Sequence, residues 1–302
     1  MLNPVDDALI EKLRAALPDG SLRPPEPRDL EEPRGKWHGQ AGIVVSPRNT
    51  EQVAEVIRQA GQARVGVVPI SGGTGLVAGQ VATQGPPPIL LSLDRMNAVR
   101  GVWPSENALV AEAGTILADV QLAADGENRL FPLSLASEGT CRIGGNLSTN
   151  AGGVQVLRYG NARDLCLGLE AVLPNGDVWH GLRRLRKDNT GYDLRNLLIG
   201  AEGTLGVITA ASLRLFPRPT RVGTAMMVVP DPAAALDLLA LAGAHLGPGV
   251  TAFELIGGQG LHFLADTGLP HRAPFADIPD WSVLIDVSAY GADDPNAALE
   301  AL

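Results

Sequence analysis

Residues 139–153 read GTCRIGGNLSTNAGG, and the interpretation of the whole chain starts from this stretch. Its five glycines are interleaved with Ser148, Thr149 and Asn150, whose hydroxyl and amide groups can form hydrogen bonds. Clustered glycines let the backbone approach a ligand closely or turn tightly. The combination suits a polar cofactor that lies along the backbone. A purely structural glycine loop is the alternative.

Two further stretches are dense in glycine. Residues 69–80 read PISGGTGLVAGQ and follow a predicted strand, and residues 200–208 read GAEGTLGVI and lead into another. Three glycines within four residues can expose consecutive backbone N–H groups, which bind phosphate without a lysine. A tight surface turn is the alternative for residues 69–80. Taken together, the three stretches indicate one extended ligand that is held from several places.

Two better-known phosphate loops do not fit residues 69–80. A Walker loop requires Gly-Lys followed by Ser or Thr, and this segment contains no lysine. Residues 73–78 do match the Rossmann pattern G-x-G-x-x-A, and Asp94 follows about 20 residues later. A Rossmann unit needs a helix before the next strand, however, and residues 79–88 end in three prolines. We therefore interpret Asp94 as a strand-end cap and not as a ribose ligand.

Composition narrows the class of protein. The 302 residues have room for two domains. The net charge of −9 argues against nucleic-acid binding, and the acidic N-terminal stretch does not resemble a signal peptide. No run of about 20 apolar residues predicts a membrane span. Cys141 and Cys166 are too few for a disulfide framework, so we expect a cytoplasmic protein in which Cys141 is a packed side chain.

The predicted elements suggest where the domains lie. Asn3 is expected to cap a first helix, Asn175-Gly176 predicts a β-hairpin, and Pro217-Arg218-Pro219 marks a boundary. Beyond it we predict a helix from Asp231 and a strand at 281–287. The expected domains are an N-terminal helix and arm (1–34), a large domain (35–219) and the start of a second domain (220–302), which breaks off in an open helix at 297–302.

In this order, the three glycine stretches resemble the flavoprotein family of vanillyl-alcohol oxidase and p-cresol methylhydroxylase (PCMH-type FAD-binding). The nearest branch is similar to the FAD-linked D-2-hydroxy-acid dehydrogenases, which act on D-lactate, glycolate or D-2-hydroxyglutarate. The resemblance spans about 35–219 and is most specific at 141–153, 186–194 and 200–209. It implies an α+β fold, with a two-subdomain PCMH-type FAD-binding domain followed by an incomplete α+β capping domain.

The resemblance also implies how FAD is held. Residues 71–75 would wrap the pyrophosphate, and 139–153 would follow the flavin and ribityl side. Residues 202–208 would contact the adenine half or nearby backbone. Covalently linked relatives have a histidine where Thr74 stands, so non-covalent FAD is expected. Gly75 is expected to need a conformation that valine cannot adopt. The residues that the resemblance assigns to FAD are Pro69, Ser71, Gly72, Gly73, Thr74, Gly75, Gly79, Gln80, Gly139, Thr140, Ile143, Gly144, Gly145, Ser148, Thr149, Asn150, Gly153, Glu202, Gly203, Gly206 and Ile208.

The implied reaction is oxidation of a small D-2-hydroxy acid to the 2-oxo acid. A base would remove the hydroxyl proton while hydride passes to flavin N5, and the substrate carboxylate would need a cation, preferably arginine. Lys187 and Asn189 are the candidates near the flavin. The basic run 183–187 is either a solvated face or a contact for an electron acceptor. No catalytic role is assigned to the five histidines, which are His38, His180, His245, His262 and His271.

In the family, the base and the metal-binding histidines come from a histidine-rich capping segment that these residues lack. We therefore predict no metal site within the chain, a divalent metal only through residues outside it, and FAD binding without turnover. The electron acceptor would be a quinone, a flavoprotein or a cytochrome, which could bring the protein to a membrane surface. A homodimer is left open. The alternatives are another flavin oxidase or dehydrogenase chemistry on this fold, or an FAD-binding subunit without catalysis.

Overall fold

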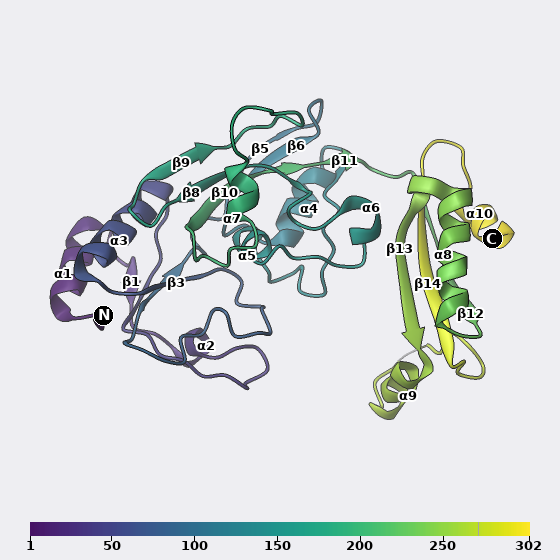
Figure 1. Ribbon diagram of the computed structural model, residues 1–302, viewed down its shortest axis with the longest axis horizontal. Coiled ribbons are helices and arrows are strands. Elements are labelled where there is room, and N and C mark those ends of the chain that lie inside the picture. The colour runs from purple at the N-terminus through teal and green to yellow at the C-terminus, as the bar shows by residue number, and fades with distance from the viewer. Residues whose placement is uncertain (271) are drawn as a thin grey trace. The chain divides into compact units, whose positions relative to one another are not determined.

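The computed structural model describes residues 1–270 and 272–302 and divides them into two compact units (Figure 1). The first unit comprises Met1–Ala151 and Asn161–Pro217, and the second comprises Gly152–Gly160 and Arg218–Leu302. The division after Pro217 lies close to the expected boundary. The membership of 152–160 in the second unit was not expected, and the roles assigned to the domains stay predictions.

The first sheet of the first unit is built around a parallel core. Its strands, in spatial order, are β1 (Leu22–Arg23), β2 (Ile43–Val45), β4 (Ile89–Ser92) and β3 (Val67–Ile70). Both β2 and β3 run parallel to β4. Helix α3 (Thr50–Ala63) connects β2 to β3 and is capped by the side chain of Asn49, which accepts from the Gln52 N–H at 2.9 Å. Helix α1 (Asp7–Ala16) packs against α3, and the short α2 (Pro27–Leu30) lies in the N-terminal arm.

Two expectations about this half of the unit can be compared with the structure. The N-terminal helix begins later than predicted, because Asp6 and not Asn3 caps it, accepting from the Leu9 N–H at 2.8 Å. Asn3 instead donates to Ala63 O at 2.9 Å. Between β3 and β4 the structure contains no helix, so the exclusion of a Rossmann unit is confirmed.

The second sheet is antiparallel throughout. Its strands, in spatial order, are β5 (Val99–Trp103), β6 (Ala108–Glu112), β10 (Val207–Arg214), β8 (Cys166–Val172) and β9 (Val178–Gly181). The predicted hairpin at Asn175-Gly176 is confirmed, since it joins β8 to β9. The remaining elements are α4 (Leu117–Asp125), β7 (Arg129–Leu130), α5 (Ile143–Ser148), α7 (Leu194–Leu198) and β11 (Phe216–Pro217). Each of the two sheets, with the helices next to it, forms one subdomain of the first unit, and this arrangement matches the expected α+β class.

The sequence analysis did not predict the helix α5, which lies inside the glycine-rich stretch 139–153. Its glycines are explained by close packing. A Cβ on Gly144 would lie 2.7 Å from the Ala113 Cβ, and one on Gly145 would lie 3.1 Å from the Ser71 Cβ. The glycines therefore allow α5 to lie directly against the end of β6 and against the loop that follows β3.

Glu170 on β8 connects the two subdomains. This buried carboxylate accepts hydrogen bonds from Thr50 Oγ1 on α3 at 2.6 Å and from Thr209 Oγ1 on β10 at 3.0 Å. Arg100 on β5 adds a contact of 3.2 Å to the same oxygen. One buried side chain thus bonds to a helix of the first subdomain and to two strands of the second.

The second unit is a three-stranded antiparallel sheet with helices. Its elements are β12 (Arg221–Val229), α8 (Pro232–Leu246), a 3₁₀ turn (Gly247–Gly249), β13 (Val250–Gly257), α9 (Gly258–Asp266), β14 (Trp281–Ala289) and α10 (Pro295–Ala301), and the spatial order of the strands is β12-β14-β13. The predicted helix after Asp231 is confirmed, because that side chain accepts from the Ala234 N–H at 2.8 Å. The core contains Val283 and Ile285, which pack with residues of α8.

The segment 152–160 joins this second unit through its short helix α6 (Val156–Tyr159), which packs against β13. The guanidinium of Arg158 lies 5.5 Å from the ring centre of Tyr290 and donates to its hydroxyl at 3.2 Å. None of the helices in residues 1–270 and 272–302 is long and apolar enough to cross a membrane.

Candidate functional site

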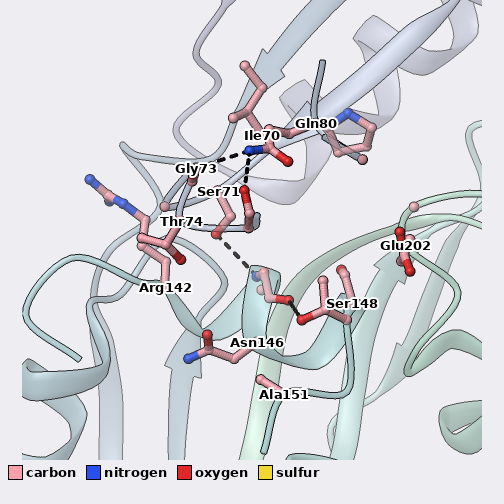
Figure 2. A pocket seen from close by; sticks show the side chains of 18 of the residues that line it. Ile70, Ser71, Gly73, Thr74, Gln80, Arg142, Asn146, Ser148, Ala151 and Glu202 are labelled. Carbon is pink, nitrogen blue, oxygen red and sulfur yellow. Dashed lines mark hydrogen bonds between the residues drawn. The ribbon is translucent and has the colours of Figure 1, made fainter. Parts of the chain in front are cut away.

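The three glycine-rich stretches, far apart in the sequence, line one cavity of about 280 Å³ in the first unit (Figure 2). The loop after β3 forms one side, α5 and the turn after it form another, and the turn before β10 forms a third. The expected cofactor residues that line the cavity are Pro69, Ser71, Gly72, Gly73, Thr74, Gly75, Gly79, Gln80, Gly144, Gly145, Ser148, Thr149, Glu202, Gly203, Gly206 and Ile208.

Five residues assigned to the cofactor from the sequence do not line this cavity, so their contact with the cofactor stays a prediction. Gly139 and Thr140 lie in the turn before α5, and Ile143 is buried beneath it. The side chain of Asn150 is already used within the protein, because its Oδ1 accepts a hydrogen bond from the Arg163 N–H at 3.0 Å. Gly153 belongs to the second unit. A glycine-dense sequence cannot distinguish residues that face a ligand from those that shape the turn behind it.

The loop after β3 offers consecutive unpaired backbone N–H groups. Within the part of the chain that the structure describes, no hydrogen bond uses the N–H groups of Gly72, Gly73, Thr74 or Gly75. These residues are half-buried or exposed, so their unpaired N–H groups are open to water or to a ligand in the cavity. Successive N–H groups in a turn form a concave site for anions. The loop is therefore suited to a phosphate or pyrophosphate.

The shape of this loop is fixed by Gln80 and by two glycines. Gln80 Nε2 donates to Gly75 O at 3.0 Å and to Gly73 O at 3.3 Å, which ties the loop back on itself. Gly73 has φ +66°, and no atom lies within 4 Å of where its Cβ would be. A Cβ on Gly72 would lie 2.7 Å from Thr140 O. The left-handed conformation expected for Gly75 is thus found at Gly73.

Hydrogen bonds hold the three walls of the cavity together. Ser71 Oγ accepts from the Gly145 N–H at 3.2 Å, which joins the loop after β3 to α5. Thr149 Oγ1 donates to Gly145 O at 2.9 Å, and the Glu202 N–H donates to Ser148 O at 2.9 Å. The residues that the sequence analysis selected are therefore brought together by direct contacts between their own segments.

The cavity contains little positive charge. Arg142 is among its lining residues, but its Nη1 donates to Gly114 O at 2.6 Å and to Asp94 O at 3.2 Å, and Figure 2 shows the guanidinium turned away from the other labelled side chains. Glu202 is the carboxylate among the described lining residues. Anionic groups of a ligand would therefore meet backbone donors.

Sequence reasoning missed several lining residues, which are Ile70, Val77, Leu93, Leu135, Ser137, Arg142, Asn146, Ala151 and Val207. Ile70 and Val207 could have been predicted as lining residues, since each lies at the strand end next to a glycine stretch. Leu93 and Leu135 carry no such signal, because an isolated leucine in a loop looks the same whether it contacts a ligand or the core.

The catalytic candidates lie elsewhere. Lys187 and Asn189 are exposed and are not among the lining residues, so their role stays a prediction. Four histidines, His38, His180, His245 and His262, are exposed and also do not line the cavity, while His271 lies outside the described residues. In residues 1–270 and 272–302, no three His, Cys, Asp or Glu side chains are grouped as metal ligands.

The two cysteines are buried and unpaired. Cys141 packs beside Asn146, whose Nδ2 lies 3.6 Å from its sulfur, so the expectation of a packed residue is confirmed. Burial raises the pKa of Cys166 to about 12, so this thiol stays protonated at neutral pH.

The fold has a solved counterpart. A crystal structure of p-cresol methylhydroxylase with substrate bound superimposes on all of this chain with a TM-score of 0.78, at 17% sequence identity, and the chain covers 65% of that structure. At this identity the similarity shows the fold. The chain therefore has the fold of the PCMH-type flavoproteins.

Sequence comparison identifies a domain family for part of the chain, and relatives for most of it. Residues 41–181 match the family model described as the FAD binding domain. The D-2-hydroxyglutarate dehydrogenase of Bos taurus mitochondria is 38% identical over 270 residues, 88% of this chain and 49% of the relative. The D-2-hydroxyglutarate dehydrogenase of Xanthomonas citri pv. viticola is 34% identical over 299 residues, 98% of this chain and 62% of the relative. The chain thus spans about half to three fifths of the length of these curated relatives.

Residues 41–181 are accordingly an FAD binding domain, and the chain is homologous to the D-2-hydroxyglutarate dehydrogenases. The observed cavity fits that cofactor on its own geometry. A Cβ on Gly73 would enter open space, the unpaired N–H groups belong to the same loop, and uncharged polar groups such as Ser148 and Thr149 line the same cavity.

Proposed function

We propose that the protein oxidises a small D-2-hydroxy acid to the corresponding 2-oxo acid, with D-2-hydroxyglutarate as the first substrate to test. The observation that carries the proposal is the row of free backbone N–H groups at 72–75, which lies in a cavity of a chain homologous to D-2-hydroxyglutarate dehydrogenases. Bound FAD would supply the two-electron acceptor for this oxidation.

The residues of this chain would bind and orient the cofactor. The loop 72–75 would hold the pyrophosphate through its backbone N–H groups. Ser148 and Thr149 would bind the sugar-like hydroxyls that adjoin it, and the backbone of Gly203 and Gly206 would close the third wall. Glu202 is the carboxylate of the described cavity, and no observation places it beside the carbon to be oxidised, so no base is assigned.

The proposed activity predicts stereospecific oxidation. FAD-loaded protein is mixed with D-2-hydroxyglutarate, D-lactate or glycolate and an artificial electron acceptor, and acceptor reduction is followed by absorbance. Reduction with a D-enantiomer and not with its L-enantiomer is expected, since one face of the α-carbon must be presented to the acceptor. Residues 1–302 alone are expected to bind FAD without turnover, so this test of the activity uses the full-length protein. Full-length protein that binds FAD but reduces the acceptor with none of these acids would overturn the proposal and favour another flavin chemistry or a binding subunit.

Non-covalent attachment of FAD is a separate prediction. Thr74 stands in the loop where a histidine would be needed for a ring-nitrogen linkage to the flavin, and no described histidine lines the cavity. Denaturation in acid should therefore release all of the yellow flavin into the supernatant after the protein is precipitated. A flavin that stays in the pellet after complete denaturation would contradict the prediction.

The partner and location are also proposals. In the basic run 183–187, Arg183 pairs with Asp188 and Arg184 pairs with Glu106. Arg186 and Lys187 are exposed and have no ion-pair partner in the part of the chain described here, which supports a contact with an electron acceptor that presents negative charge. The proposed acceptor is a quinone, a flavoprotein or a cytochrome, and the proposed location is the cytoplasm. A homodimer is left open. The bovine relative is named as mitochondrial.

A further inference from the structure

The N-terminal arm has a fixed shape around one buried acid. The segment 31–38 folds back on itself through an antiparallel bridge between its two ends. Inside this turn, the side chain of Glu32 is fully buried and accepts from the Arg34 N–H at 3.0 Å and from the Lys36 N–H at 2.8 Å. The same carboxylate lies 3.6 Å from Arg34 Nε. One carboxylate therefore holds both the backbone and the guanidinium of Arg34.

Arg34 connects this arm to the loop after β3. Its Nη2 donates to Leu76 O, which belongs to that loop. A second bond joins the arm to the same connection further along, because the Gln40 N–H donates to Ala82 O at 3.0 Å. The match to the FAD binding domain begins only at residue 41. One wall of the cavity is thus held by a segment that precedes the matched domain.

The bond from Arg34 sets the direction of a further backbone donor. In a trans peptide the carbonyl and the N–H that follows it point in opposite directions, and the described residues contain no cis peptide. Because Leu76 O is held by Arg34, the N–H of Val77 points to the opposite side of that peptide. Val77 lines the cavity, and in the part of the chain that the structure describes no hydrogen bond uses its N–H. Gln80 fixes two earlier peptides of the loop in the same way.

The end of this loop needs a hold from outside. Ala78 adopts φ +62°, a left-handed conformation that residues other than glycine seldom adopt. Such a conformation persists only where the surroundings enforce it. Packing contributes little here, since the side chain of Val77 is 84% exposed and that of Leu76 is also exposed. A loop without the bond from Arg34 would have to be ordered by its ligand, which lowers the affinity.

We infer that Arg34 is a positioning residue of the FAD site, which orders the end of the loop so that the Val77 N–H extends the row of donors at 72–75. The inference rests on the FAD site of the proposed function and not on the oxidation. It requires no contact between Arg34 and the cofactor. Because the side chain of Arg34 is 46% exposed, water weakens its bond, and we expect its loss to lower the affinity for FAD about three- to tenfold.

The experiment compares Arg34→Met, which removes every donor of the side chain, with Arg34→Lys, which keeps one. Arg28→Met is the matched control, since Arg28 lies in the same arm, pairs with Glu26 at 2.9 Å and does not line the cavity, and the change in net charge is the same. Quenching of flavin fluorescence measures the affinity of the cofactor-free protein for FAD. Hydrogen exchange in the cofactor-free protein follows the bonded amides of Gln40 and Val81.

Arg34→Met should bind FAD about three- to tenfold more weakly than Arg28→Met, and Arg34→Lys should recover part of the loss. Exchange at Gln40 and Val81 should accelerate in Arg34→Met and stay unchanged in α5. An affinity of Arg34→Met within about twofold of the control overturns the inference. Equally accelerated exchange in α5 also overturns it, because the substitution would then loosen the whole unit. Wild type that binds no FAD would instead refute the FAD site itself.

Discussion

Gly73→Val should abolish FAD binding and leave the chain folded. Gly73 has φ +66° and no protein atom within 4 Å of its Cβ position, so the valine side chain would enter the open cradle next to the free N–H groups. It would occupy the space that the pyrophosphate needs. A left-handed valine also costs about 1–3 kcal/mol in backbone strain, which a domain of this size can tolerate.

The matched control for this prediction is Gly85→Val. Gly85 lies in the same connection between β3 and β4, has φ +84° and is equally open, but does not line the cavity. Both variants should lose similar thermal stability, as measured by circular dichroism. Only Gly73→Val should fail to quench flavin fluorescence in a titration. Equal loss of FAD binding in both variants would mean that strain, and not the cradle, controls binding.

Glu170→Ala should strongly destabilise the first unit. The substitution removes the acceptor of two buried hydroxyls and leaves the guanidinium of Arg100 without this partner. Breaking such a buried network costs about 2–4 kcal/mol. Urea unfolding monitored by circular dichroism should show a midpoint well below that of Glu127→Ala, the exposed control. A midpoint within error of the control would contradict the prediction.

The same carboxylate should make stability depend on pH. Burial raises the pKa of Glu170, but the hydrogen bond from Thr50 and the contact with Arg100 outweigh burial, so the pKa in the folded state lies below the usual 4.5. A lowered pKa contributes stability above the unfolded value, and this contribution is lost as pH falls through the folded one. The difference in unfolding free energy between wild type and Glu170→Ala should therefore shrink below about pH 4.5.

Much of the fold was predictable where local chemistry is strong. The Asn175-Gly176 turn, the helix after Asp231 and the absence of a helix before Ile89 each depend on a few neighbouring residues, and each was confirmed. Helix α5 was not predictable, because glycines weaken helices in isolation. It is stable here because Gly144 and Gly145 let it pack against segments distant in the sequence, which no local pattern records.

For the cavity, too, the sequence predicted some features and could not predict others. The glycine stretches located its walls, but the sequence could not show which glycine supplies the left-handed turn, and Gly73 does so in place of Gly75. It could not show that Asn150 is occupied by the Arg163 N–H, since the two are joined only by the folded chain. A high density of glycines indicates where the backbone closely approaches a ligand or another segment of the chain. Only the tertiary structure shows which of the two it is.

The path of the chain through 152–160 restricts how the molecule can be divided or recombined. This segment leaves the first unit after Ala151 and returns at Asn161, while its helix α6 packs against β13 of the second. A single cut after Pro217 would separate α6 from β13 and Arg158 from Tyr290. A chimera that takes the second unit from a relative would therefore need to exchange two stretches of sequence together, because residues 218–302 alone would meet a foreign α6.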